Sequence, residues 1–338
     1  EIKKDSIFSE FKDKQGELII GYIQRIRGDS LYIDLGNYEG VLPKRNQPPN
    51  ETYQQGERIK TIIEDVKKSG QSLWYDNIER AKLFDGSLKS MISAGKIRGI
   101  TSNPSIFQKA IATSNDYDVT LKPMAWAGLD SESIFWQLAI EDIQKAAQLF
   151  LPIFDTSKGL DGFVSLEVSP LLAYDTERTV KEARELWARV NMPNLMIKIP
   201  ATKEGIPAIR RAIAAGINVN VTLIFSNDRY KEVMGAYIAG LEDRLAQGLP
   251  VEHIASVASF FVSRIDTKID SKLQDQVKGG NLTPGEYAIL AGKAAIANAK
   301  LAYRQFEEVF TSDRFNVLKD HGAHVQRPLW ASTSTKNP

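Results

Sequence analysis

Cysteine is missing from this 338-residue sequence, and histidine occurs only three times. Without cysteine the chain can form neither a disulfide framework nor a thiolate metal site, and three scattered histidines argue against a zinc site. We therefore predict that the protein binds no metal. A reducing compartment such as the cytoplasm suits a chain of this composition.

Long apolar runs and an excess of one charge are missing as well. No stretch approaches the roughly 20 apolar residues that a membrane-spanning helix needs, and the first five residues do not begin a signal peptide. The sequence has 43 Lys and Arg against 42 Asp and Glu, so no global field attracts nucleic acid or an anionic membrane. We expect a soluble, intracellular protein without a membrane partner. We interpret the chain, which begins without Met, as a fragment at both ends.

The sequence does have enough hydrophobic residues, 43% of the total, to build a large core, and their pattern changes near residue 70. Between residues 16 and 66 they come in short alternating runs, such as LIIGYI and LYIDL, separated by turn-forming stretches such as RGDS and PPN. Four or five short strands in this region predict a small all-β barrel of the OB type over residues 1–69.

From residue 71 to residue 338, short apolar runs alternate with long amphipathic segments. This order predicts parallel strands joined by helical crossovers. Seven strands without a GxGxxG sequence favour a closed (β/α) barrel over an open dinucleotide-binding sheet. The predicted strands are 72–76, 97–102, 163–168, 195–200, 219–225, 255–261 and 325–332. The predicted helices include 131–152, 177–190, 203–215, 227–246 and 284–310, the last capped by Thr283 before Pro284.

Each predicted strand carries a polar residue near its carboxyl end. In a barrel of this type the loops after the strands form the mouth, where chemistry takes place, whereas the strand interiors are packed core. The candidate site therefore consists of these residues: Asp76, Asn103, Glu167, Lys198, Asn220 with Thr222, Ser259 and Ser332.

Lys198 is the most specific of these signals, because aliphatic residues flank it on both sides in the central strand LMIKIP. A lysine so placed loses hydration on folding, which favours the neutral amine, and a neutral amine can attack a carbonyl group. The alternative is a buried lysine that pairs with a carboxylate such as Glu167 or Asp76. These two carboxylates could serve as acid and base in forming and collapsing a carbinolamine, or only as ion-pair partners in the core.

Three further signals also have an ordinary structural interpretation. Asn103 before Pro104 is typical of a helix N-cap with proline in the first turn. Arg264 follows a predicted strand and suits bidentate binding of a phosphate, but an arginine in such a place is commonly ion-paired or solvated. His321 and His324 are predicted to be loop residues rather than ligands.

Several stretches of residues 71–338 resemble transaldolase of the larger bacterial type, and they occur in that family's order. They are SLWYDNIERAKL, GITSNPSIFQKAI, VSLEVSPLLAYDTERTV, NLMIKIPATKEGIPAI, INVNVTLIFS, SVASFFVSRID and QRPLWASTSTKNP. The resemblance implies a (β/α)8 barrel of the TIM type. In the family an eighth strand and terminal helices follow the tract matching residues 331–338, so the resemblance also implies that the eighth strand is missing here.

The resemblance also implies an activity. A transaldolase of the pentose phosphate pathway moves a dihydroxyacetone unit from a ketose phosphate, such as sedoheptulose 7-phosphate or fructose 6-phosphate, to an aldose phosphate. The reaction passes through a lysine Schiff base and needs no cofactor.

Carried over residue by residue, the resemblance assigns roles within the candidate site. Lys198 would be the Schiff-base nucleophile, and Asp76 would transfer the proton in carbon–carbon cleavage. Glu167 and Thr222 would hold a catalytic water. The other residues would contact the substrate: Asn103 and Asn220 its hydroxyls or the covalent intermediate, Ser259 and Phe261 as the wall of the site, and Arg264, Ser332 and, more weakly, Lys336 its phosphate.

The N-terminal region has a resemblance of its own. FSEF, GELIIG, IDLG, EGVLP and YQQGER are similar to the OB-type RNA-binding domain of the bacterial transcription factor NusA. This implies RNA as a partner of residues 1–69, by stacking on Tyr22 and Tyr32 and by charge neutralisation through four basic residues: Arg25, Arg27, Lys44 and Arg45. Alternatively, the tyrosines pack a small barrel and the basic residues only solvate it.

An OB-type segment followed by this barrel suggests a chimeric sequence. The alternative function for the chain is then that of an RNA-binding termination or antitermination factor, carried by residues 1–69.

Overall fold

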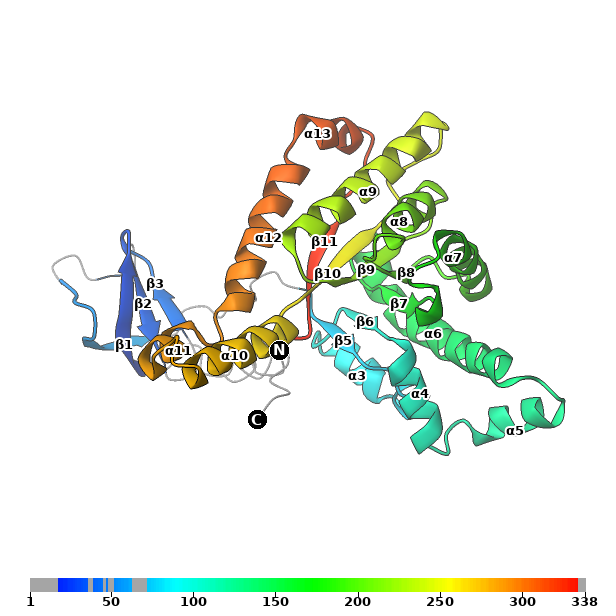
Figure 1. Cartoon of the computed structure of the whole chain (residues 1–338), viewed down its shortest axis with the longest axis horizontal. Helices are drawn as coiled ribbons and strands as arrows, with labels where there is room; N and C mark the ends of the chain where they lie inside the picture. The colour runs from blue at the N-terminus through cyan, green and yellow to red at the C-terminus, as the bar shows by residue number, and fades with distance from the viewer. Residues whose placement is uncertain (1–17, 36–38, 45–46, 48–51, 63–71, 334–338) are drawn as a thin grey trace. The chain divides into compact units, whose positions relative to one another are not determined.

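The computed structural model describes residues 18–35, 39–44, 47, 52–62 and 72–333. The chain divides into two compact units, Glu1–Gln71 and Ser72–Pro338. Figure 1 labels their strands and helices. Two residues named from the sequence, Arg45 and Lys336, lie outside the described residues.

The described part of Glu1–Gln71 forms an antiparallel sheet with the strand order β3-β2-β1-β4. Its strands are β1 (Leu18–Arg27), β2 (Ser30–Asp34), β3 (Glu39–Leu42) and β4 (Arg58–Ile62). Burial alternates along β2, where Leu31 and Ile33 pack inward with Ile23 of β1. β1 pairs with both β2 and β4, and an irregularity between Ile23 and Arg25 bends it. The short strands predicted for this region are confirmed as a small antiparallel sheet.

The described residues of Ser72–Pro338 form a parallel sheet in which each strand pairs with its neighbour in the sequence, in the order β11-β10-β9-β8-β7-β6-β5. Its strands are β5 (Trp74–Asp76), β6 (Gly99–Thr101), β7 (Val164–Glu167), β8 (Leu195–Pro200), β9 (Val219–Ile224), β10 (Ser256–Phe261) and β11 (Arg327–Ala331). Every one lies within a predicted strand. The sheet is curled, and this α/β architecture is consistent with a TIM-type barrel (Figure 1).

Helices connect the strands. Those in the described residues are α2 (Arg80–Phe84), α3 (Ser87–Ser93), α4 (Pro104–Thr113), α5 (Asp118–Trp126), α6 (Ser131–Thr156), the short η2 (Pro170–Leu172), α7 (Thr176–Val190), α8 (Gly205–Ala214), α9 (Asn227–Ala246), α10 (Ser263–Lys278), α11 (Pro284–Leu290), α12 (Ala294–Phe310) and α13 (Asp313–Asp320). In α7 the residues at helical spacing, Val180, Ala183 and Leu186, are buried, which explains why this helix packs on the sheet. None of the described helices combines the length and the apolar character that crossing a bilayer requires.

The prediction of a single helix over 284–310 is wrong, because α11 ends before α12 begins. Ala291 has an extended backbone, and Gly292 adopts a left-handed φ of 69°. The backbone N–H of Gly292 donates to the Asp270 carboxylate at 3.1 Å, which holds the break. Apolar spacing continues across the break, so periodicity alone does not reveal it. The predicted cap is confirmed, since Thr283 forms a capping box with Glu286.

Apolar side chains fill both sides of the curled sheet. On the helix-covered side a large core includes strand residues such as Ile197 and Ile199. On the other side Phe163, Met196 and Val257 form a separate cluster, with Trp74 and Leu329 packed against it. Because this cluster combines residues from both ends of the strand order, it occupies the interior of the barrel. A Cβ atom on residue 99 would lie 2.7 Å from the Trp74 ring, so the tight fit there requires Gly99.

An ion cluster lies at the amino ends of the same strands. Asp161 accepts hydrogen bonds from Arg98 Nε at Oδ2 and from the Ser72 hydroxyl at Oδ1, each at 2.7 Å, and Arg327 Nη2 lies 4.0 Å from the same Oδ1 atom. The charges therefore lie at the end of the barrel opposite the carboxyl ends of the strands.

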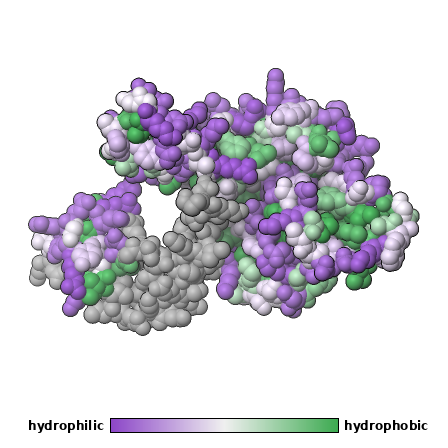
Figure 2. Space-filling model, turned by 60° about the horizontal axis from the view of Figure 1, so that its bottom comes forward, coloured by the Kyte–Doolittle hydropathy of each residue, from purple (hydrophilic) through white to green (hydrophobic). Residues whose placement is uncertain are grey.

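The outer surface seen in Figure 2 is largely hydrophilic, with small hydrophobic areas between.

Candidate active site

Strand register brings the sequence-predicted residues to one end of the sheet. Glu167 of β7 lies opposite Lys198 of β8, and Lys198 lies opposite Asn220 of β9. Asp76 ends β5 and lies opposite Thr101 of β6. Since parallel strands end at the same edge, these side chains occur together where a barrel has its mouth.

Lys198 lies at the centre of this group and is buried, with 7% of its surface exposed. Its Nζ atom is 3.1 Å from Glu167 Oε2 and donates to the backbone carbonyl of Ser102 at 3.2 Å. The ion pair that the sequence left open as an alternative is therefore present. A buried amine in contact with a carboxylate is also the arrangement that passes a proton from one to the other.

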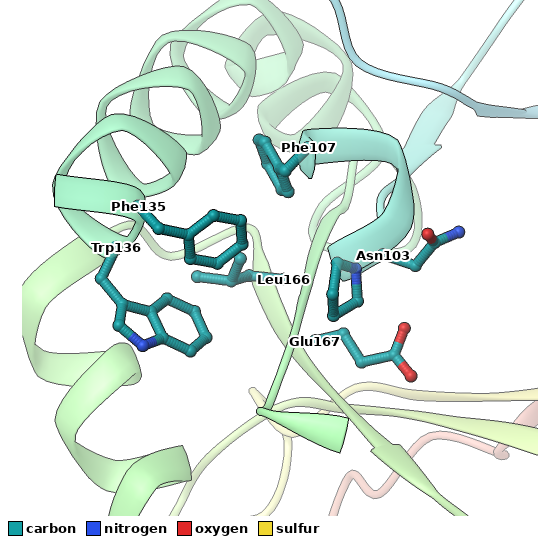
Figure 3. A pocket seen from close by; sticks show the side chains of 7 residues that line it. Asn103, Phe107, Phe135, Trp136, Leu166 and Glu167 are labelled. Carbon is teal, nitrogen blue, oxygen red and sulfur yellow. The ribbon is translucent and has the colours of Figure 1, made fainter. Parts of the chain in front are cut away.

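Glu167 has apolar neighbours on its other side. Figure 3 shows a small pocket in which the Glu167 carboxylate lies apart from the rings of Phe107, Phe135 and Trp136. Burial raises the pKa of Glu167 above its ordinary value of 4.5, and the Lys198 charge only partly offsets this effect. Glu167 is therefore better suited to exchange a proton near neutral pH than an exposed glutamate.

Asp76 is the exposed carboxylate of the group, in contrast to Glu167. The Thr101 hydroxyl donates to its Oδ1 atom at 2.7 Å, which fixes the orientation of the carboxylate. The negative charge of Asp76 also contributes to the raised pKa of Glu167. The site thus contains two carboxylates in different environments, a separation that favours different proton-transfer roles.

Asn220 is held between two hydroxyl groups. Its Nδ2 atom lies 3.0 Å from Ser165 Oγ, and its Oδ1 atom lies 2.7 Å from Ser259 Oγ. All three residues are buried, so the contacts fix the plane of the amide. Thr222, two residues further along β9, is also buried, and it lies opposite Pro200.

Asn103 is the N-cap of α4. Its side-chain oxygen accepts a hydrogen bond from the backbone N–H of Ile106 at 3.0 Å, and Pro104 occupies the first turn. The structural interpretation of this pair is confirmed. Asn103 nevertheless directly follows Ser102, whose carbonyl contacts Lys198, so the cap lies beside the lysine.

Arg264 and Ser332 lie at the ends of neighbouring strands. The Arg264 guanidinium is 5.0 Å from the centre of the Phe261 ring. Ser263, the residue before Arg264, donates both its backbone N–H and its hydroxyl to the Ser332 carbonyl. The structure therefore brings these two candidates close to each other at the end of β10 and β11. His321 and His324 lie between α13 and β11, in the loop where they were predicted.

Sequence reasoning did not identify Thr101, Ser102 or Ser165 as partners of the candidate residues. For Ser165 a signal existed, because it precedes Glu167 by two positions on a strand and so shares its face. No sequence signal existed for the contact of the Ser102 carbonyl with Lys198, since this contact depends on how β6 and β8 meet across the barrel.

Of the described residues proposed for RNA contact, Tyr22, Arg25, Arg27 and Tyr32 lie on strands of the small sheet, and Lys44 follows β3. Tyr22 of β1 is 55% exposed, and Lys44 is exposed as well. Arg25 lies over the Tyr32 ring, 4.5 Å from its centre, so these two side chains contact each other.

The parallel sheet and the polar group at the carboxyl ends of its strands define the class, an α/β enzyme whose curled sheet is consistent with a TIM-type barrel. Comparison with known proteins identifies the family. The model of the family described as transaldolase/fructose-6-phosphate aldolase matches residues 73–338.

Curated relatives agree with this match. Transaldolase of Saccharopolyspora erythraea is 51% identical over 276 residues, which cover 82% of this chain and 73% of that protein. Transaldolase of Thermobifida fusca is 49% identical with the same coverage, and that of Trichodesmium erythraeum is 47% identical over 81% of this chain and 73% of its own. The chain belongs to the transaldolase/fructose-6-phosphate aldolase family, and it is a transferase of the aldolase type.

Proposed function

We propose that the chain transfers a dihydroxyacetone unit from sedoheptulose 7-phosphate or fructose 6-phosphate to an aldose phosphate, through a Schiff base on Lys198. The observation that carries this proposal is the buried contact between Lys198 Nζ and Glu167 Oε2 at 3.1 Å. Family membership supports sugar phosphates as the substrates. The reaction places the protein in the pentose phosphate pathway, and we infer that it works in the cytoplasm.

The first steps need a neutral amine. Glu167 takes a proton from the Lys198 ammonium, and the amine attacks the ketose carbonyl carbon to give a carbinolamine. Loss of water then gives an iminium ion, with Glu167 and Thr222 holding the water that leaves and later returns. The raised pKa of Glu167 suits this exchange, because the carboxyl group must carry the proton in part of the cycle.

The iminium ion then serves as an electron sink. Asp76 removes the proton of the substrate C4 hydroxyl, the C3–C4 bond breaks, and its electron pair moves into the iminium to form an enamine. The aldehyde fragment leaves, while the three-carbon unit stays bound to Lys198. Addition of the acceptor aldehyde reverses these steps, and hydrolysis releases the new ketose.

The other candidates hold the substrate. Asn220, fixed by Ser165 and Ser259, has one N–H and one lone pair left for substrate hydroxyls. Asn103 lies beside the lysine and contacts the same part of the substrate. Arg264 and Ser332 bind the phosphate, a role supported by their proximity through Ser263.

Borohydride trapping tests the proposal. Fructose 6-phosphate and borohydride are added to the full chain, and peptide mass spectrometry locates any reduced adduct. We expect an adduct on Lys198 and none in Lys198→Met. A Lys198→Met chain that keeps its affinity for fructose 6-phosphate, with no adduct on the wild-type chain, would instead indicate a barrel that only binds sugar phosphates. Release of free dihydroxyacetone without an acceptor would indicate an aldolase.

We infer a second function, RNA binding, for residues 1–69, and we infer that their sheet is of the OB type. The long first strand that pairs with both β2 and β4 supports the fold, and the exposed Tyr22 beside the Arg25–Tyr32 pair supports stacking on bases. We expect salt-dependent affinity for single-stranded RNA that is lost when Tyr22 and Tyr32 are both replaced by Ala. Affinity that survives this double change would exclude the idea.

A further inference from the structure

β9 contains a strained residue directly after Thr222. Leu223 has a φ of 60°, in the left-handed region that leucine rarely adopts. The pairing with β10 shifts at the same place, since Val221 lies opposite Ala258 but Ile224 lies opposite Phe260. Leu223 is therefore the extra residue of a β-bulge.

The bulge decides which side chain reaches the mouth. In a regular strand Ile224 would share a face with Asn220 and Thr222. With the extra residue, Ile224 turns outward and is fully buried in the helix-covered core. Phe225 takes the place at the mouth, where 39% of its surface is exposed.

Phe225 begins a row of three side chains. Its ring centre lies 5.1 Å from that of Phe261, and the Arg264 guanidinium lies 5.0 Å from the centre of the same Phe261 ring. The first contact has the geometry of a packed aromatic pair, and the second that of a cation–π contact. Phe261 thus connects Phe225 with the cation.

The backbone of Phe225 is held from outside the barrel. Asn298 of α12 donates its amide Nδ2 to the Phe225 carbonyl at 2.9 Å. The Asn227 side chain in turn donates to Asn298 Oδ1 at 2.6 Å. Phe225 is therefore fixed both by the bulge before it and by a helix beside it.

We infer that Phe225 is a positioning residue for the phosphate end of the site, which holds the Arg264 guanidinium in place through the Phe261 ring. The inference rests on the proposed function, in which Arg264 binds the substrate phosphate. Phe225 is expected to affect phosphorylated ligands and not the three-carbon unit bound to Lys198. The strained backbone of Leu223 forms the bulge, and the bulge brings Phe225 to the mouth.

Equilibrium binding to the full chain with Lys198→Met tests the inference without any covalent step. Calorimetry with fructose 6-phosphate compares this variant with its combinations with Phe225→Ala, Phe225→Tyr and Arg264→Ala. We expect Phe225→Ala to raise the Kd roughly two- to fivefold, the size of an exposed cation–π contact. Phe225→Tyr keeps the ring and should leave the Kd unchanged, and adding Phe225→Ala to Arg264→Ala should have no further effect.

Two controls separate positioning from general damage. Phe84→Ala removes another exposed phenylalanine, which lies on α2 with Lys145 near its ring, and it should not change the Kd. Borohydride trapping with dihydroxyacetone, which has no phosphate, should give as much Lys198 adduct in Phe225→Ala as in the wild type.

An unchanged Kd in Phe225→Ala, or effects of Phe225→Ala and Arg264→Ala that add in full, would overturn the inference. An equally large loss of the Lys198 adduct with dihydroxyacetone in Phe225→Ala would also overturn the inference. If the Kd for fructose 6-phosphate changes in these variants as expected but the wild type forms no Lys198 adduct, the result would count against the proposed function alone.

Discussion

Lys198 and Glu167 show how the environment of a single residue determines its chemistry. Lys198 is buried and Glu167 is mostly buried; the Glu167 carboxylate lies apart from the nearby aromatic rings and contacts Lys198, which also reaches the Ser102 carbonyl. Desolvation therefore acts strongly on the carboxyl group, and its pKa is raised. Burial raises the proton affinity of the carboxylate in this ion pair. The two groups therefore share the proton more evenly than an exposed lysine–glutamate pair does.

The raised pKa of Glu167 predicts a pH-dependent contribution to stability. The folded state binds the Glu167 proton more tightly than the unfolded state, so the slope of unfolding free energy against pH is negative for this group. The contribution is complete below the ordinary pKa of 4.5 and is lost as the pH rises through the folded-state value. Denaturant unfolding at several pH values should show that the wild type loses stability relative to Glu167→Gln across this window. Parallel curves for the two proteins would contradict the prediction.

Asn103 allows a structural role to be separated from a binding role. Asn103→Ala removes the cap of α4 and should cost roughly 1 kcal/mol of unfolding free energy. Asn103→Ser and Asn103→Asp keep a cap acceptor and should retain most of this stability. If Asn103 also contacts substrate, both should still lower kcat/KM, measured at a temperature where all variants are folded. Full activity in both capped variants would mean that Asn103 serves only as the N-cap of α4.

At the scale of elements, a buried polar network connects α2, α5 and α6. Asp142 of α6 is fully buried and accepts from Arg80 Nε of α2 and from the Tyr117 hydroxyl before α5, each at 2.8 Å. The Arg80 guanidinium also lies over the Tyr117 ring, at 4.6 Å from its centre. Arg80 begins α2 four residues after Asp76 ends β5, so this network anchors the loop after β5.

Removing the charge of this network should be costly. Asp142→Asn leaves a buried Arg80 without its closest carboxylate, and we expect a loss of roughly 3 kcal/mol of unfolding free energy. Tyr117→Phe removes only one hydrogen bond and should cost about 1 kcal/mol. Denaturant unfolding of both variants compares the two losses. Equal losses would mean that the Arg80–Asp142 charge pair adds nothing beyond a neutral contact.

The elements also show which features a sequence pattern can predict. Runs such as LMIKIP, which is buried along its whole length, identify central strands, and every strand of the parallel sheet lies within a predicted strand. The candidate residues follow, since each lies near the end of such a strand. The break at Gly292 and the bulge at Leu223 were not predictable, because each depends on a tertiary contact that leaves the apolar pattern unchanged. Phe225 was missed for the same reason.

At the scale of the whole molecule, every residue of the candidate site belongs to the unit Ser72–Pro338. The family match likewise begins at residue 73. We therefore expect a chain that starts at Ser72 to form the Lys198 adduct with the same half-saturating fructose 6-phosphate concentration as the full chain. Borohydride trapping of both chains measures this. A loss of trapping in the shorter chain, with its circular dichroism preserved, would show that the first unit contributes to the site.

The strand order determines the sequence in which the residues of the site can come together during synthesis. Each strand of the parallel sheet pairs with the one made just before it. Lys198 meets partners that leave the ribosome earlier, Ser102 and Glu167, whereas Arg264 and Ser332 are made later. In a growing chain the proposed nucleophile can therefore find its partners before the residues that would select its substrate exist.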